Sequence, residues 1–201
     1  MQTDFIFKIV ILIISIMAHE VAHGAVAYAF GDPTAKNQGR LTLNPIKHID
    51  LFGSIILPLL LYLTHANFLF GWAKPVPYNP YNLKNRRVGE FCVAIAGILT
   101  NFLIAIVFAF IIRFAAVWGL SVAVIDLLKF IIYLNITLGV FNLVPVPPLD
   151  GSKILFTLVP YRYERELLVL ERYGFFILIV LILIFGYLIG DIVSFLFNLI
   201  V

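Results

Sequence analysis

The chain has 201 residues, of which 62% are hydrophobic and only 12% are charged, and its formal net charge is +3. Soluble domains carry about 25% charged residues, so this composition excludes a single water-surrounded core and predicts a multi-spanning membrane protein. The small positive charge does not indicate a nucleic-acid partner, because basic residues in membrane proteins typically mark cytoplasmic loops. The lipid bilayer is therefore the expected environment.

Four stretches are apolar and long enough to cross a hydrocarbon core of about 30 Å as helices. They are residues 4–30, 88–118, 121–144 and 173–197. Residues 51–70 are also apolar but contain Gly53, Pro58 and a polar THAN sequence. Prolines and basic residues exclude 71–87 from a lipid-facing span, and 160–172 mix charges with leucines as interfacial helices do. The expected fold is all-α, with about four transmembrane helices in a single domain, residues 1–201.

The first span contains the sequence HEVAH, residues 19–23, which fits the pattern H-E-x-x-H. On a helix, His19 and His23 share one face and can bind one Zn²⁺, while Glu20 can take a proton from a water molecule. The alternative is three side chains hydrogen-bonded to one another within a helix bundle. Ionisable residues at membrane depth usually mark function, and this favours the metal site.

A catalytic zinc requires a third protein ligand and an open position for water. His48 and His65 are candidates, but both lie beside turn-like or polar segments. Asp150 is the better candidate, because it follows a predicted span and is flanked by apolar residues. An Asp-Gly pair is also common at helix starts and turns. Three prolines before it prevent regular helix and free backbone groups near the site: Pro145, Pro147 and Pro148.

The motifs HEVAH and NLVPVPPLDG together resemble the site-2 protease family of intramembrane zinc metalloproteases. GRLTLNPIKHID, residues 39–50, and GWAKPVPYNP, residues 71–80, are similar to its short bacterial branch, which lacks a PDZ domain. The resemblance covers roughly residues 15–155. It implies one zinc ion per chain, held by His19, His23 and Asp150, with Glu20 as general base in a single membrane-embedded metalloprotease domain.

The family also carries a Gly-Pro-x-x-Asn pattern, which is present here in AGILTN, residues 96–101. Gly97 and Asn101 match this pattern, whereas Ile98 replaces the usual proline. Asn142 matches the asparagine that precedes the family's proline run. The resemblance implies that Asn101 and Asn142 contact the substrate backbone or the oxyanion; for Asn142, a hydrogen bond to a neighbouring helix is an equal alternative.

The zinc ligands also constrain the topology, because they must meet on one side of the membrane. His19 and His23 lie near the C-terminal end of the first span, and Asp150 follows the span 121–144. If residues 51–70 crossed the membrane, Asp150 would emerge on the opposite face. We therefore predict four full spans, a re-entrant element around residues 51–70, and both termini on the outer side.

In this topology nearly all basic residues outside the spans lie on the active-site side, while Arg113 lies on the other. They are Lys36, Arg40, Lys47, Lys74, Lys84, Arg86, Arg87, Lys153, Arg162, Arg165 and Arg172. The positive-inside rule therefore predicts that the active site opens to the cytoplasmic side of the cell membrane.

The predicted function is hydrolysis of peptide bonds in transmembrane substrates by zinc-activated water. The expected partners are the substrate and the lipid bilayer, with room for a regulatory membrane partner. One alternative is a metal transporter, which requires polar residues at several membrane depths, whereas here they cluster at one. Another is a non-catalytic binding protein on a protease fold, which predicts a damaged H-E-x-x-H motif or a missing third ligand. Neither defect is present in this sequence.

Overall fold

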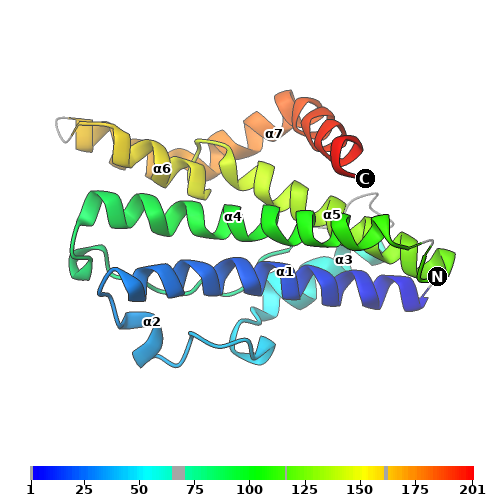
Figure 1. Cartoon of the computed structure of the whole chain (residues 1–201). Coiled ribbons are helices and arrows are strands. Elements are labelled where there is room, and N and C mark those ends of the chain that lie inside the picture. The colour runs from blue at the N-terminus through cyan, green and yellow to red at the C-terminus, as the bar shows by residue number, and fades with distance from the viewer. Residues whose placement is uncertain (1, 65–70, 116, 161–162) are drawn as a thin grey trace.

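The computed structural model describes residues 2–64, 71–115, 117–160 and 163–201 as a bundle of helices (Figure 1). Four helices in this described part are long and apolar enough to cross a membrane: α1 (Gln2–Ala29), α4 (Arg86–Arg113), α5 (Val122–Leu143) and α7 (Glu164–Ile200). No β-strand occurs among the same residues. The predictions of an all-α membrane protein and of four spans are confirmed.

The long helices alternate in direction, and both chain ends lie at the same end of the bundle (Figure 1). Helix α7 continues unbroken from Glu164 to Ile200. The segment predicted as an interfacial helix, residues 160–172, is therefore largely the first part of the last span, although residues 161–162 lie outside the described part of the chain. A 37-residue helix is about 55 Å long, which exceeds the thickness of the hydrocarbon core.

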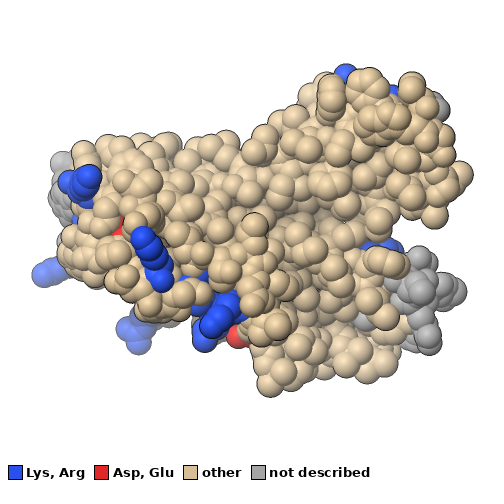
Figure 2. Space-filling model, turned by 60° about the horizontal axis from the view of Figure 1, so that its bottom comes forward, with Lys and Arg blue, Asp and Glu red and all other residues tan. Residues whose placement is uncertain are grey.

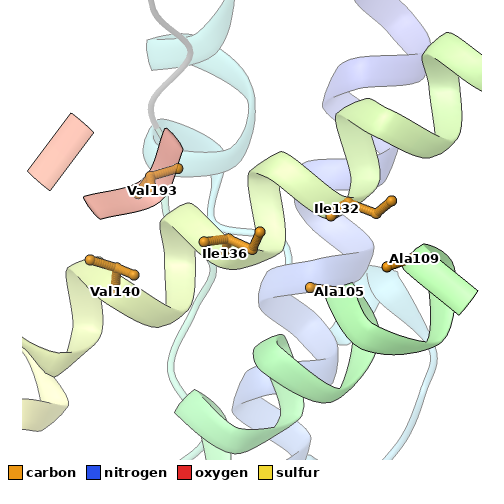
Figure 3. Close-up of a cluster of buried hydrophobic side chains, with 6 residues drawn as sticks. All are labelled: Ala105, Ala109, Ile132, Ile136, Val140 and Val193. Carbon is orange, nitrogen blue, oxygen red and sulfur yellow. The ribbon is translucent and has the colours of Figure 1, made fainter. Parts of the chain in front are cut away.

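Helix α4 lies at the centre of the bundle, where it packs against α1, α5 and α6 (Asp150–Leu158), while α7 packs against α5. A buried apolar cluster joins α4, α5 and α7 (Figure 3): Ala105, Ala109, Ile132, Ile136, Val140 and Val193. Ala105 and Ala109 lie one turn apart on α4. Such small side chains let two helix backbones approach closely, which stabilises helix pairs in an apolar solvent.

The apolar segment after residue 50 forms two short helical elements, the π-helical η2 (Leu51–Ile56) and α3 (Leu57–Leu63). Together they are about 20 Å long, too short to cross a core of about 30 Å. The backbone N–H of Trp72 donates to the Gly53 carbonyl at 3.1 Å, so the chain has returned to the start of this segment by residue 72. This return is consistent with a re-entrant element, but insertion into the bilayer stays a prediction.

Residues 71–79, here called the 71–79 segment, run alongside α1 and the preceding loops, which contain α2 (Thr34–Asn37) and η1 (Pro45–Lys47). The Lys74 N–H donates to the His48 carbonyl at 2.8 Å. The Arg40 guanidinium donates to the carbonyl oxygens of Lys74 and Pro75 at 2.8 and 3.2 Å. These hydrogen bonds hold the 71–79 segment against the preceding loops. After it, η3 (Pro80–Asn82) leads into α4.

Asp32, just after α1, is fully buried and joins the end of this helix to the start of η3. Its carboxylate accepts from the backbone N–H and the hydroxyl of Thr34, at 3.1 and 2.5 Å. It also accepts from the Asn79 N–H at 2.7 Å and the Asn82 side-chain amide at 2.8 Å. Burial alone would raise the pKa of Asp32, but the hydrogen bonds from Thr34, Asn82 and Asn79 outweigh it and hold the pKa below its ordinary value.

Replacing Asp32 with asparagine is expected to lower the free energy of unfolding by about 1–3 kcal/mol at pH 7, because an amide N–H then faces a buried donor. Thermal unfolding in detergent measures this difference between wild type and variant. Because the folded-state pKa is lowered, the difference should be complete above about pH 4, the ordinary aspartate pKa, and shrink as the pH falls through the folded-state value. Asp126→Asn, which changes an exposed carboxylate on α5, is the control. Equal unfolding temperatures for Asp32→Asn and wild type at pH 7 would contradict the prediction.

Candidate metal centre

His19 and His23 lie one turn apart on α1, and both side chains are buried, with each residue 6% exposed. Their Nε2 atoms are 3.0 Å apart, and the two rings meet edge to face with centroids separated by 4.6 Å. The i and i+4 spacing predicted that these side chains share a face. The structure confirms this placement, and both Nε2 atoms point to the same place between α1, α4 and α6.

Asp150 completes the group, as predicted from its position after the proline run. Its Oδ2 atom lies 3.0 Å from Nε2 of His19 and 3.0 Å from Nε2 of His23. Helix α5 ends at Leu143, just before the prolines, and Asp150 is the first residue of α6. At Gly151 a Cβ atom would lie only 2.3 Å from the Leu143 carbonyl oxygen, so glycine lets α6 begin directly against the end of α5.

The other ring nitrogens of the two histidines face acceptors. Nδ1 of His19 lies 2.5 Å from the side-chain oxygen of Asn101, and Nδ1 of His23 lies 2.6 Å from the carbonyl oxygen of Val93. Because these oxygens can only accept, we assign the proton of each imidazole to Nδ1. Each Nε2 then carries a lone pair directed at the shared point, which is the arrangement of a metal-ligating histidine with its outer hydrogen bond.

The donor set fits a zinc ion. Three acceptor atoms meet at separations of 3.0 Å and, in this tautomer, no proton lies between them, so they repel one another unless a cation is shared. In a tetrahedral zinc site with bonds of about 2.0–2.1 Å, neighbouring ligand atoms are about 3.3 Å apart. Within the described part of the chain, no other group of three or more His, Cys, Asp or Glu side chains converges in this way.

Of the two alternative third ligands, the structure describes only His48, which does not join this group. His48 is fully buried, and its Nε2 atom lies 2.8 Å from the Thr42 carbonyl oxygen, in the loops before η2. His65 lies outside the described residues. Of the candidates that the structure describes, Asp150 lies beside the two histidines and His48 does not.

Glu20 follows His19 on α1 and is partly buried. Its Oε2 atom accepts a hydrogen bond of 2.8 Å from the backbone N–H of Val76, in the 71–79 segment. This contact anchors one carboxylate oxygen beside the two histidines. The segment GWAKPVPYNP, noted in the sequence for its resemblance to a protein family, thus touches the residue predicted to act as the base.

Lys153 contacts the carboxylate of Asp150 from outside the metal site. Its Nζ atom lies 3.3 Å from Oδ1, and it also lies over the Tyr78 ring at 5.8 Å. Burial lowers the pKa of Lys153, but the Asp150 carboxylate outweighs this effect, so the pKa lies above its ordinary value. Lys153 therefore engages one oxygen of Asp150 while the other points at the histidines.

Gly97 on α4 provides the space that the two imidazoles occupy. A Cβ atom there would lie 2.6 Å from Cε1 and Nε2 of His19 and 2.6 Å from Nε2 of His23. Real Cβ atoms essentially never make contacts this short. Gly97 was noted in the sequence only as a match to a family pattern, and the packing supplies its physical reason.

The two asparagines predicted to contact substrate have different environments. Asn101 is fully buried, and its amide is engaged with His19 and Asn135. Asn142 is partly buried and donates to the Leu138 carbonyl of its own helix at 2.9 Å. Neither contact tests a role in substrate binding, which stays a prediction for both residues.

Sequence reasoning missed Val93, Asn135 and Ser15 as neighbours of the site. Val93 contributes only its backbone oxygen, so its side chain carries no signal. Asn135 lies at membrane depth on α5, and a polar residue inside a predicted span was the one signal that could have singled it out.

Comparisons with known proteins relate this chain to zinc metalloproteases. The model of "Peptidase family M50" matches residues 115–185, which include Asp150. The chain is 40% identical over 181 residues to a Bacillus subtilis protein named "Putative zinc metalloprotease YwhC", covering 87% of this chain and 79% of that protein. It is 29% identical over 180 residues to "Putative zinc metalloprotease Rip2" of Mycolicibacterium smegmatis, covering 89% and 67%. No solved structure matches the chain.

Proposed function

Because this chain belongs to peptidase family M50, the site-2 protease family of zinc metalloproteases, we propose that it hydrolyses peptide bonds of transmembrane substrates inside the membrane. The observation that carries the proposal is the convergence of His19, His23 and Asp150 beside Glu20, within a protein that has four apolar helices of spanning length. The histidines precede the end of α1 at Ala29 by ten and six residues, which is about 15 and 9 Å of helix. This depth supports a site below the membrane surface.

His19, His23 and Asp150 are proposed to hold one zinc ion per chain. When bound, zinc supplies Lewis-acid chemistry, which polarises a carbonyl group and acidifies a water molecule. Nδ1 of each histidine is hydrogen-bonded to an acceptor, on Asn101 or Val93, and Lys153 contacts one oxygen of Asp150. These contacts leave Nε2 of both histidines and Oδ2 of Asp150 for the metal.

Glu20 is proposed to be the general base. It accepts a proton from the attacking water through one carboxylate oxygen and later transfers that proton to the leaving amine. The Val76 N–H, at 2.8 Å from Oε2, orients the carboxylate. Because Glu20 directly follows His19 on α1, the proposed base lies next to the three proposed ligands.

The charge distribution supports an active site that opens to the cytoplasm. Lys and Arg side chains gather over the part of the molecule where α1 ends and α4 begins, and most of the rest of the visible face is uncharged (Figure 2). Because cytoplasmic loops are enriched in basic residues, this end is proposed to face the cytoplasm. Both chain ends then face the opposite side, and the substrate enters from the bilayer.

Replacing Glu20 with glutamine is expected to lower the rate of cleavage by about 10²–10⁴-fold, the contribution of a positioned general base. Purified, zinc-loaded protein in liposomes would be given a peptide whose apolar segment spans the bilayer, and products would be identified by mass spectrometry. Zinc content should stay at one ion per chain in the variant, because Glu20 is not among the three ligands and glutamine can still accept from Val76.

Glu166→Gln, which removes an exposed carboxylate on α7, should cleave as wild type does and serves as the matched control. Equal cleavage by Glu20→Gln and wild type would exclude Glu20 as the base. Cleavage of the peptide only when it is presented in water, and never within its apolar segment, would contradict the intramembrane proposal.

A further inference from the structure

A row of buried polar side chains extends from the metal site into the apolar bundle. It links His19 on α1 to Asn101 on α4, Asn135 on α5 and Ser15, which is one turn before His19 on α1. Asn101 and Asn135 have no exposed surface, and Ser15 is 3% exposed. Buried polar groups at this depth are costly unless they are paired, and here each is paired with the next.

The hydrogen bonds in this row have a defined direction. Asn135 donates through its amide nitrogen to the Ile131 carbonyl oxygen at 2.9 Å and to Ser15 Oγ at 3.0 Å. A backbone carbonyl oxygen can only accept, so the Asn135 amide cannot be turned over without losing this bond. Its oxygen therefore faces Asn101 and accepts from that residue's amide nitrogen at 3.0 Å. Asn101 in turn must present its own oxygen to His19.

We propose that Asn135 is a positioning residue that sets the tautomer of His19 through Asn101. With the Asn101 oxygen against Nδ1, the His19 proton stays on Nδ1 and Nε2 keeps the lone pair needed by a metal. If the Asn101 amide turned over, its N–H would face Nδ1 and favour the tautomer with the proton on Nε2, which cannot bind a metal. This inference rests on the proposed zinc site, and it gives Asn101 a role in positioning rather than in substrate contact.

The alternative is that the row only holds α1, α4 and α5 together, as interhelical polar contacts do in membranes. A purely adhesive role does not depend on which end of each amide faces its neighbour. The positioning role does, because only an acceptor at residue 101 keeps the His19 proton on Nδ1. Substitutions that separate acceptor chemistry from packing therefore decide between the two.

The test measures zinc affinity by chelator competition in detergent. Asn135→Leu removes the acceptor that orients Asn101 and should weaken zinc binding about tenfold, the lower end of the effect of outer-shell partners. Adding Asn101→Asp to Asn135→Leu should restore the affinity to within about threefold of wild type, because a carboxylate presents an acceptor to His19 in either orientation. Ile132→Ala, a buried apolar change on the same helix, is the packing control and should keep wild-type affinity.

A second readout uses metal-free protein with ¹⁵N-labelled histidine. The nitrogen chemical shifts of His19 should report a proton on Nδ1 in wild type and in the double variant, and a shift towards Nε2 in Asn135→Leu. If Asn135→Leu does not fold, Asn135→Ala, which removes the same acceptor without adding apolar volume, takes its place in both measurements.

Wild-type affinity and tautomer in the Asn135 variant would overturn the proposal. So would a loss of affinity that Asn101→Asp does not restore, or an equal loss in Ile132→Ala, since either result assigns the row to helix packing. Failure of wild-type protein to bind zinc would instead contradict the proposed function, and the metal-free tautomer measurement would still decide the role of Asn135.

Discussion

Replacing Gly97 with alanine should abolish stoichiometric zinc binding at concentrations that saturate wild type. The added Cβ atom would lie 2.6 Å from Nε2 of both histidines, the two atoms that would bind the metal. The rings cannot move away easily, because Asn101 and Val93 hold their Nδ1 atoms. Overpacking a close-packed interior costs about 1–3 kcal/mol, and displacement of two ligands should weaken zinc binding by at least about 100-fold.

Isothermal titration of metal-free protein with zinc measures this effect, and circular dichroism checks that the helices persist. Gly190→Ala is the matched control, because Gly190 lies on α7 and a Cβ atom there would meet nothing within 4 Å. That control should bind zinc as wild type does and unfold at the same or a higher temperature, since alanine favours helix over glycine. Unchanged zinc binding by Gly97→Ala would mean that the histidines bind no metal at this point.

Replacing Asp150 with asparagine should separate zinc affinity from the stability of the metal-free protein. The side chain keeps its shape but loses its charge, and its amide can donate to Nε2 of a histidine. Loss of an outer-shell partner weakens metal binding about 10–100-fold. Loss of the Asp150 charge should lower zinc affinity by more than this. The metal-free variant, in contrast, should unfold at or above the temperature of metal-free wild type, because a donor replaces one of three mutually repelling acceptors.

Thermal unfolding with and without zinc provides the comparison. At a zinc concentration 100 times the dissociation constant, binding stabilises wild type by about 2.7 kcal/mol, whereas the variant should gain little at the same concentration. Asp126→Asn, on the exposed surface of α5, controls for the loss of a carboxylate. An equal zinc-dependent rise in unfolding temperature for Asp150→Asn and wild type would remove Asp150 from the ligand set.

The spans could be predicted from the sequence because apolar runs of this length must be helical in a bilayer, where no water satisfies free backbone groups. Pro145, Pro147 and Pro148 predicted the break that ends α5 at Leu143. The division of residues 160–197 into an interfacial helix and a span was less accurate, because charge at Arg165 and Glu171 changes the surroundings of a helix without interrupting its backbone hydrogen bonds.

The resemblance to the site-2 protease family, carried by HEVAH and NLVPVPPLDG, is confirmed by the family comparisons. The sequence alone left His48 and His65 beside Asp150 as third ligands, because spacing along a chain does not measure distance in space. Asn135 escaped notice for a related reason. Its partners Asn101 and Ser15 are 34 and 120 residues away, and only the packing of α1, α4 and α5 brings them together.

The sequence by itself determined that the protein is helical, that it lies in a membrane, and that two histidines share a helix face with a glutamate beside them. These properties depend on overall composition and on the local geometry of one helix. Both can be inferred from the sequence without knowing how the helices pack. Only the tertiary structure shows that Asp150 lies beside the two histidines, which acceptors face their Nδ1 atoms, and why residue 97 is glycine. Those features depend on contacts between helices, where distances of a few tenths of an ångström separate a fitted metal site from a clash.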